Sequence, residues 1–241
     1  MTKYIFYLLI FSLAGCGVGN NPQKIVDKAI EVHGGELFLN STVEFDFRDR
    51  HYVAFRNGGT YRYERIWRDS TGSYRDVLSN DGFYREVEGA KVDLPDSMAA
   101  KYTRSVNSVV YFALLPYGLN DAAVRKKWLG ETTLKDQPYY KIEVTFAEEG
   151  GGEDHTDVFH YWIHQEKFTV DYLAYLYHTD GGGIRFREAI NPRNINGMLL
   201  QDYINYEPPS KSASLDEMEE LFRQGSLKEL SRIALENISV K

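Results

Sequence analysis

Residues 42–48, with the sequence Thr-Val-Glu-Phe-Asp-Phe-Arg, alternate apolar and polar side chains without interruption. Val43, Phe45 and Phe47 fall on one side of this repeat, and acidic residues stand between them. A period of two is typical of a β-strand that buries one face and exposes the other. The following Asn57-Gly58-Gly59 predicts a tight hairpin turn. The two signals together indicate an antiparallel sheet.

The same pattern continues on the C-terminal side of this hairpin. Tyr61, Tyr63 and Trp67 continue on the returning strand, and further turns are predicted at residues 70–72 and 80–82. Aromatic residues make up 14% of the chain, including 18 tyrosines, which suits half-buried strand faces. We therefore expect a meander of about four strands before residue 88.

The rest of the chain adds helices and a second group of strands. Helical spacing and capping residues predict helices over 22–32, 96–115 and 121–128, and Ser214 with Glu217 forms a capping box for a helical tail that reaches about Asn237. Further strands are predicted at 139–146, 158–164, 169–178, 184–190 and 198–206. The expected fold is mainly β (α+β): a curved antiparallel sheet or half-barrel covered by helices, with an N-terminal helix and a C-terminal helical tail.

The N-terminus carries the strongest motif in the sequence. Lys3 precedes an apolar run of about ten residues, which is too short to span a bilayer and is typical of a secretory signal. The run ends in Leu13-Ala14-Gly15-Cys16, which resembles the lipobox of bacterial lipoproteins at all four positions. That resemblance implies cleavage before Cys16 and attachment of lipid to its thiol, which would give durable membrane anchoring.

These signals divide the chain into four parts. We expect a signal peptide at residues 1–15, a lipidated cysteine and tether at 16–21, the half-barrel domain at 22–209 and the helical tail at 210–241. Residues 17 and 18 are not aspartate, and by the sorting rule of enteric lipoproteins this predicts the outer membrane, with the domain facing the periplasm.

Composition excludes several classes of function. A net charge of −7 without a dense basic patch argues against nucleic-acid binding. Cys16 is the only cysteine, so the mature domain has none left for a disulfide, a cysteine-based zinc site or a thiol nucleophile. Catalytic and nucleotide-binding motifs are absent, so we expect no enzyme activity and no cofactor. The oligomeric state stays open.

The order of predicted elements resembles the lipoprotein carriers of the Lol system. The resemblance covers roughly residues 22–207 and rests on the opening Ala29–Gly35 stretch and on the segments 129–131 and 139–142. The opening stretch is also similar to that of a family of uncharacterised lipoproteins. The carrier resemblance implies a concave cavity that binds acyl chains, although no arginine here can be matched to the carriers' lid-locking arginine and the helical tail lies outside their pattern.

The inward-facing apolar residues are the candidate ligand site. The wall candidates from the strands are Phe45, Phe47, Tyr61, Tyr63, Trp67, Ile142, Val144 and Phe146. The lid candidates from the middle helix are Val109, Val110, Phe112 and Leu114. These side chains either line an open cavity or fill one another as a solid core, and both arrangements fit the pattern.

One polar cluster is a weaker metal-site candidate. It comprises His155, Asp157, His160 and His164. Histidine and carboxylate side chains suit zinc, but alternation on a strand puts His160 and His164 on one face and His155 and Asp157 on the other. Surface histidines beside an acidic loop explain the same residues.

The predicted function is binding or handling of an acyl chain or another hydrophobic ligand by a lipid-anchored envelope protein, with a lipoprotein as a possible ligand. One alternative is a glycan-binding or hydrolytic surface lipoprotein, which requires aromatic residues on a solvent-facing platform. Another is a structural envelope protein whose C-terminal helix docks a partner through Leu215, Met218, Leu221 and Phe222.

Overall fold

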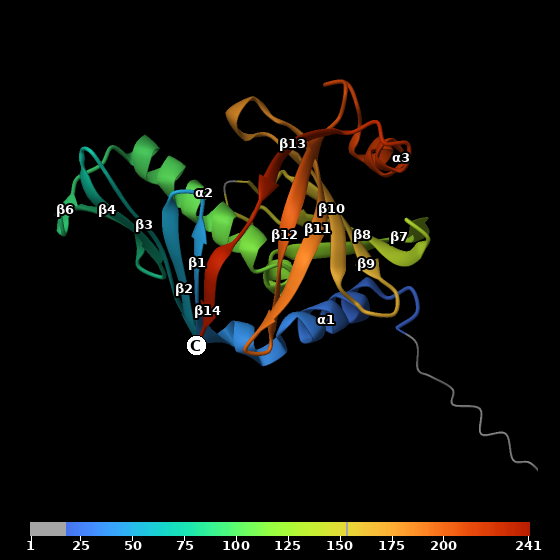
Figure 1. Ribbon diagram of the computed structural model, residues 1–241, viewed down its shortest axis with the longest axis horizontal. Coiled ribbons are helices and arrows are strands. Elements are labelled where there is room, and N and C mark those ends of the chain that lie inside the picture. The colour runs from blue at the N-terminus through green and yellow to red at the C-terminus, as the bar shows by residue number, and fades with distance from the viewer. Residues whose placement is uncertain (1–17, 153) are drawn as a thin grey trace, which may run out of the picture.

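The computed structural model describes residues 18–152 and 154–241. The predicted signal peptide and Cys16 lie outside the described residues. Within them the chain forms two seven-stranded antiparallel sheets and three α-helices, which confirms the predicted mainly β fold (Figure 1). No helix in the described part of the chain is long and apolar enough to cross a membrane.

The first sheet is the meander that the alternating sequence predicts. Its strand order is β14-β1-β2-β3-β4-β5-β6. The strands that follow one another along the chain are β1 (Asn40–Phe47), β2 (Arg50–Asn57), β3 (Thr60–Asp69), β4 (Gly72–Ser79), β5 (Gly82–Val87) and β6 (Ala90–Val92). The predicted turn between β2 and β3 is present, and Gly58 takes the positive φ of 60° that such a turn requires.

The second sheet has the order β13-β12-β11-β10-β9-β8-β7. Its strands are β7 (Val124–Leu134), β8 (Gln137–Phe146), β9 (Val158–His164), β10 (Val170–Tyr177), β11 (Gly183–Ile195), β12 (Met198–Glu207) and β13 (Lys228–Ile233). The short helix predicted at 121–128 is wrong: a 3-10 turn (Tyr117–Asn120) precedes β7, which begins at Val124. Pairing with β8 along the whole of β7 outweighs the local helical preference of the segment.

Two helices cover the inner faces of the sheets. Helix α1 (Pro22–His33) is capped by the Asn21 side chain, which accepts a hydrogen bond from the Lys24 amide, and it packs on β7 and β12. Helix α2 (Asp96–Ala113) packs on β3, β4 and β5 and runs to the middle of the molecule, where the two sheets meet (Figure 1). Both helices were expected from the sequence.

The C-terminal region differs from its prediction. After the 3-10 turn η4 (Leu215–Glu217), which carries the expected capping box, helix α3 covers only Met218–Arg223. The expected helix to about Asn237 is therefore wrong, because β13 and then β14 (Glu236–Val240) follow. Gly225, with φ of 67°, ends the helical region. Strands β12 and β1 would otherwise be edge strands with unpaired backbone N–H and C=O groups. Strand β13 forms hydrogen bonds with β12, and β14 forms them with β1.

Strands β13 and β14 connect the two sheets. They are separated only by residues 234–235, and β13 pairs with β12 while β14 pairs with β1. Asp202 of β12 fixes this crossing: its Oδ1 accepts the Leu235 amide at 2.9 Å, and both carboxylate oxygens accept Arg193 at 2.7 and 2.8 Å. One buried carboxylate thus holds the point where the chain leaves one sheet for the other.

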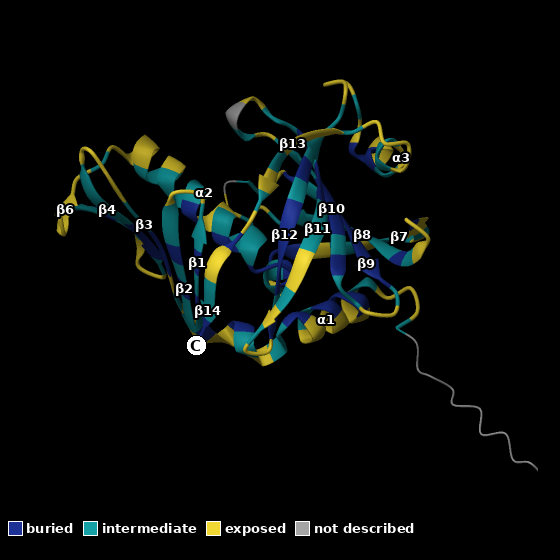
Figure 2. Ribbon diagram, viewed as in Figure 1, coloured by how far each residue is buried: buried dark blue, intermediate teal, exposed yellow. Residues whose placement is uncertain are grey.

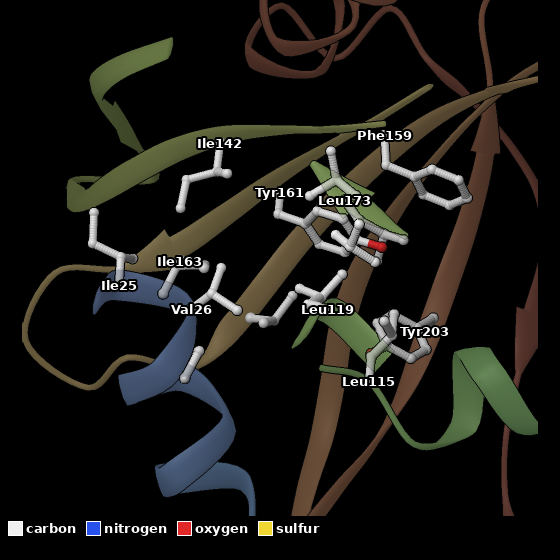
Figure 3. Packing of buried hydrophobic residues seen from close by; sticks show 14 residues of the cluster. Ile25, Val26, Leu115, Leu119, Ile142, Phe159, Tyr161, Ile163, Leu173 and Tyr203 are labelled. Carbon is white, nitrogen blue, oxygen red and sulfur yellow. The ribbon is translucent and has the colours of Figure 1, made fainter. Parts of the chain in front are cut away.

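Three hydrophobic clusters fill the molecule. One lies between α1 and the inner face of the second sheet, and Figure 3 shows Ile25 and Val26 of the helix against Ile142, Ile163 and Leu173 of the strands. A second lies between α2 and the first sheet. The third covers the outer face of the second sheet with α3, so strands β9, β10 and β12 are buried along much of their length, whereas β11 is exposed toward its end (Figure 2).

We predict that Asp202→Asn destabilises the protein at neutral pH. Burial would raise the pKa of Asp202, but hydrogen bonds from Arg193, the Leu235 amide and Asn191 lower it below its ordinary value. Removing one partner of a buried ion pair costs about 3–5 kcal/mol of stability. Because the Arg193 side chain is 30% exposed, solvent weakens this pair, and we expect the free energy of unfolding measured in urea to fall by roughly 2–3 kcal/mol.

The effect must depend on pH in one direction. A lowered folded-state pKa contributes stability above the unfolded pKa of about 4, and this contribution is lost as pH falls through the folded pKa. The free energies of unfolding of the wild-type protein and of Asp202→Asn should therefore become similar in acid. Glu229→Gln, on exposed β13, is the control and should change little; an equal loss in both variants would contradict the role given to Asp202.

Candidate functional site: a cavity between helix α2 and the second sheet

A cavity of about 400 Å³ lies between the C-terminal half of α2 and the inner face of the second sheet. Residues of β9–β12, of the segment joining β8 to β9, and of the end of β13 and its link to β14 complete its wall. Most of the side chains that line it are apolar or aromatic. The aromatic lining residues are Phe47, Tyr111, Phe112, Phe146, Phe159, Tyr175, Tyr177 and Tyr203.

Helix α2 contributes the side of the cavity that faces the strands. Phe112 packs against Tyr175 with ring centroids 5.2 Å apart and against Phe159 at 6.3 Å. Phe159 stacks on Tyr175 at 5.3 Å. In Figure 3, Phe159 and Tyr203 lie at the end of the first cluster that is remote from α1. The cavity therefore continues the hydrophobic core where α1 no longer covers the sheet.

The Arg187 side chain lies in this apolar part of the cavity wall. Arg187 of β11 is only 7% exposed, and its guanidinium carbon lies 3.7 Å from the centroid of the Phe112 ring. Its Nη2 donates to the Tyr175 hydroxyl at 2.9 Å. Nε and Nη1 are buried and have no hydrogen-bond partner among the described residues. A buried charge with unmade hydrogen bonds is costly, so its presence in the cavity wall calls for an explanation.

Several phenols lie in or beside the same cavity as Arg187. Tyr111 and Tyr161 share a hydrogen bond of 2.9 Å between their hydroxyls. Burial raises the pKa of Tyr111, Tyr161 and Tyr203 above the ordinary value, and Arg187 opposes this rise for the last two. These phenols are therefore neutral at physiological pH and do not neutralise the guanidinium.

The far side of the lining is polar. Asp154, Asp157, Tyr177, Thr179 and Arg185 line it. The Asp157 carboxylate accepts the His178 amide at 3.2 Å, yet burial raises the pKa of Asp157 above its ordinary value. Among the described residues, this lining thus has two acidic and two basic side chains when Arg187 is included.

The sequence of the chain matches the model of a family described as a family of unknown function (DUF6503) over residues 2–235. The chain belongs to this family. Comparison with curated proteins finds no significant match.

Several solved structures are similar to this fold. A DUF1329 family protein from Desulfovibrio piger matches with a TM-score of 0.50 at 11% identity, over 90% of this chain and 92% of that chain. A LolA superfamily protein from Nitrosomonas europaea matches with a TM-score of 0.49 at 12% identity over 91% of both chains. An outer-membrane lipoprotein-sorting protein domain, described as putative, from Vibrio parahaemolyticus matches with a TM-score of 0.43 at 8% identity, over 77% and 86%.

The structure separates the predicted cavity residues into two groups. Phe47, Val109, Phe112 and Phe146 line the cavity. The others pack elsewhere: Phe45, Tyr63, Val110, Leu114, Ile142 and Val144 are buried in the two inner clusters, Tyr61 packs against the second cluster, and Trp67 stacks on Tyr74 at 4.8 Å. The open cavity and the solid core therefore coexist, in different parts of the fold.

Sequence reasoning missed the strand residues of the site. Arg185 and Arg187 alternate with Ile184 and Phe186, a pattern that normally places the charged residues in solvent. Here Ile184 and Phe186 pack under α3 on the outer face, and the arginines point inward. The alternation can be read from the sequence, but which of the two sets of side chains faces inward depends on α3 covering the outer face of the sheet.

The candidate metal residues are not brought together. His164 accepts the amides of Glu166 and Lys167 in the β9–β10 turn, His160 lies 3.6 Å from Glu143, and His155 contacts the Gly152 carbonyl. Asp157 bonds His178 instead. In the described part of the chain no group of three or more potential ligands is placed to hold a metal ion.

We predict that Arg187→Met makes the ligand-free protein more stable. The methionine fills similar space and removes a buried charge with unmade hydrogen bonds, so the free energy of unfolding should rise by about 1 kcal/mol or more. Chemical denaturation of both proteins checks this. A clear loss of stability would show that the guanidinium is a structural element rather than one held ready for a ligand.

Proposed function

We propose that this protein is a lipid-anchored envelope protein that binds an acyl chain or a similar hydrophobic ligand in the cavity between α2 and the second sheet. The observation that carries the proposal is a largely apolar, aromatic-lined cavity of about 400 Å³. Volumes of this order are usual for small-ligand sites. The sequence resemblance to lipoprotein carriers implies the same class of ligand.

Helix α2 is the natural cover of this site. Asn107 and Ser108 are exposed and Val109 is half-buried, yet all three border the cavity, so its opening lies beside the C-terminal half of the helix. A ligand that enters there meets Phe112 and the aromatic residues of β9 and β10. We infer that the protein holds its ligand without changing it chemically.

Two alternatives receive less support. A glycan platform needs aromatic faces open to solvent, whereas Phe159 and Tyr203 of the site are buried. A partner-docking C-terminal helix needs a free apolar stripe, whereas Leu215 and Met218 are buried and Leu221 and Phe222 pack on the outer face of the second sheet.

Native mass spectrometry of the protein purified without detergent tests the binding proposal. We expect a bound lipid, and we expect Val109→Asp to weaken its retention about ten-fold or more, because the new charge borders the apolar cavity. Met98→Asp places the same change on the exposed first turn of α2 and is the matched control. A ligand-free mass that persists after incubation with phospholipid or fatty acid would contradict the proposal.

Anchoring is tested separately with Cys16→Ser in a Gram-negative host. Without the thiol no lipid can be attached, so the variant should move from the membrane fraction to the soluble fraction and lose incorporation of labelled fatty acid. Retention of Cys16→Ser in the membrane fraction, with labelling unchanged, would contradict lipid anchoring and would leave the cavity proposal intact.

A further inference from the structure

We propose that the ligand is a single-chain amphiphile with one negative charge on its head, such as a fatty-acid carboxylate, and that Arg187 binds that head inside the cavity. This inference rests on the proposed function and names the class of ligand. It starts from one feature that hydrophobic binding alone does not need: a guanidinium in the wall of an apolar cavity.

Arg187 lacks the counter-ion that buried arginines elsewhere in this fold have. Arg65 and Arg85 both donate to the buried carboxylate of Asp76, at distances of 2.5 to 3.0 Å. Arg187 has only the Tyr175 hydroxyl and the face of Phe112, and its Nε and Nη1 remain without partners in the described part of the chain. Since a buried charge is normally paired, the site has room for an anion that the chain does not supply.

Tyr175 provides a second contact for the same head. Its hydroxyl accepts from Arg187, so its own O–H remains to donate to an anion beside the guanidinium. Hydrogen bonds from charged donors to a carboxylate are about twice as strong as those between neutral groups. Arg187 and Tyr175 lie on paired strands, where Tyr175 faces Arg185 in the register, so the rigid sheet positions both donors.

The rest of the lining suits one hydrocarbon chain. Phe47, Ala113, Ile233 and Leu235 contribute apolar surface to the same cavity. A volume of about 400 Å³ is near the lower end of the usual range for ligand pockets, which favours one chain over a lipid with two or more. The head would bind Arg187 while the chain follows this apolar surface.

The charges of the lining favour a singly charged head over a phosphate. Asp154 and Asp157 match Arg185 and Arg187 in number without being hydrogen-bonded to Arg187, so the described residues of the lining carry no excess positive charge. Arg185 also donates to the Ile184 carbonyl, whereas Arg187 keeps free donors. One guanidinium balances a carboxylate, but a doubly charged phosphate would keep a surplus charge near two carboxylates.

The test compares three ligands that share a ten-carbon chain: decanoate, decanol and decyl phosphate, each titrated calorimetrically into the purified protein. We expect decanoate to bind about ten-fold or more tightly than decanol. The Arg187→Met variant should bind decanoate about ten- to a hundred-fold more weakly than the wild-type protein does, while its affinity for decanol should change little. Retained decanol binding shows that the variant is folded. Arg232→Met, on exposed β13, is the charge-matched control and should behave as wild type.

The contradicting outcomes are distinct. Equal binding of decanoate and decanol by the wild-type protein, or an equal loss of both in Arg187→Met, would overturn the role of Arg187 and leave the hydrophobic cavity standing. Tighter binding of decyl phosphate than of decanoate would overturn the singly charged head. Failure of all three ligands to bind would overturn this inference and the proposed function together.

Discussion

The architecture depends on one chain segment, residues 228–240, whose two strands β13 and β14 pair with different sheets. In the described chain only the segment 228–240 is hydrogen-bonded into the first sheet and into the second. Asp202 holds the crossing by accepting the Leu235 amide and the Arg193 guanidinium. Ile233 and Leu235, on either side of this point, also line the cavity. The interaction that joins the sheets therefore also shapes the binding site, and the cavity exists because two sheets meet there under the end of α2.

The buried charges of this protein follow two different rules. Asp202 and Asp76 are surrounded by arginine and amide donors, so their burial is compensated within the chain. Arg187 is buried to a similar extent but keeps two nitrogens without partners among the described residues. A buried charge that is paired within the chain is compatible with a purely structural role. The unpaired guanidinium of Arg187 is instead explained by the proposed anionic ligand, which would pair with it. This contrast, more than the volume of the cavity, is the basis for proposing a ligand at Arg187.

Local patterns in the sequence predicted much of the fold. Alternation over 42–48, the turn at Asn57-Gly58-Gly59 and the apolar stripe of α1 each encode a local structure, and each was confirmed. The segment 228–240 could not be predicted this way, because its strands form by pairing with edges that are remote in sequence. The residues of the cavity are subject to the same limit, because contacts remote in sequence decide which of them face inward. Phe112 and Val109 were found from the apolar run of α2, but the inward direction of Arg187 depends on α3 covering the opposite face.

The central claim is that the ligand occupies the space between α2 and the second sheet. A fatty acid carrying a diazirine near the end of its chain, photolysed on the purified protein and mapped by peptide mass spectrometry, tests it directly. The structure predicts cross-links to the C-terminal half of α2 and to the segment around Leu235 that joins β13 to β14, suppressed by excess decanoate. Labelling confined to the first sheet beyond β1, or to the exposed surface of α3, would contradict the location of the site.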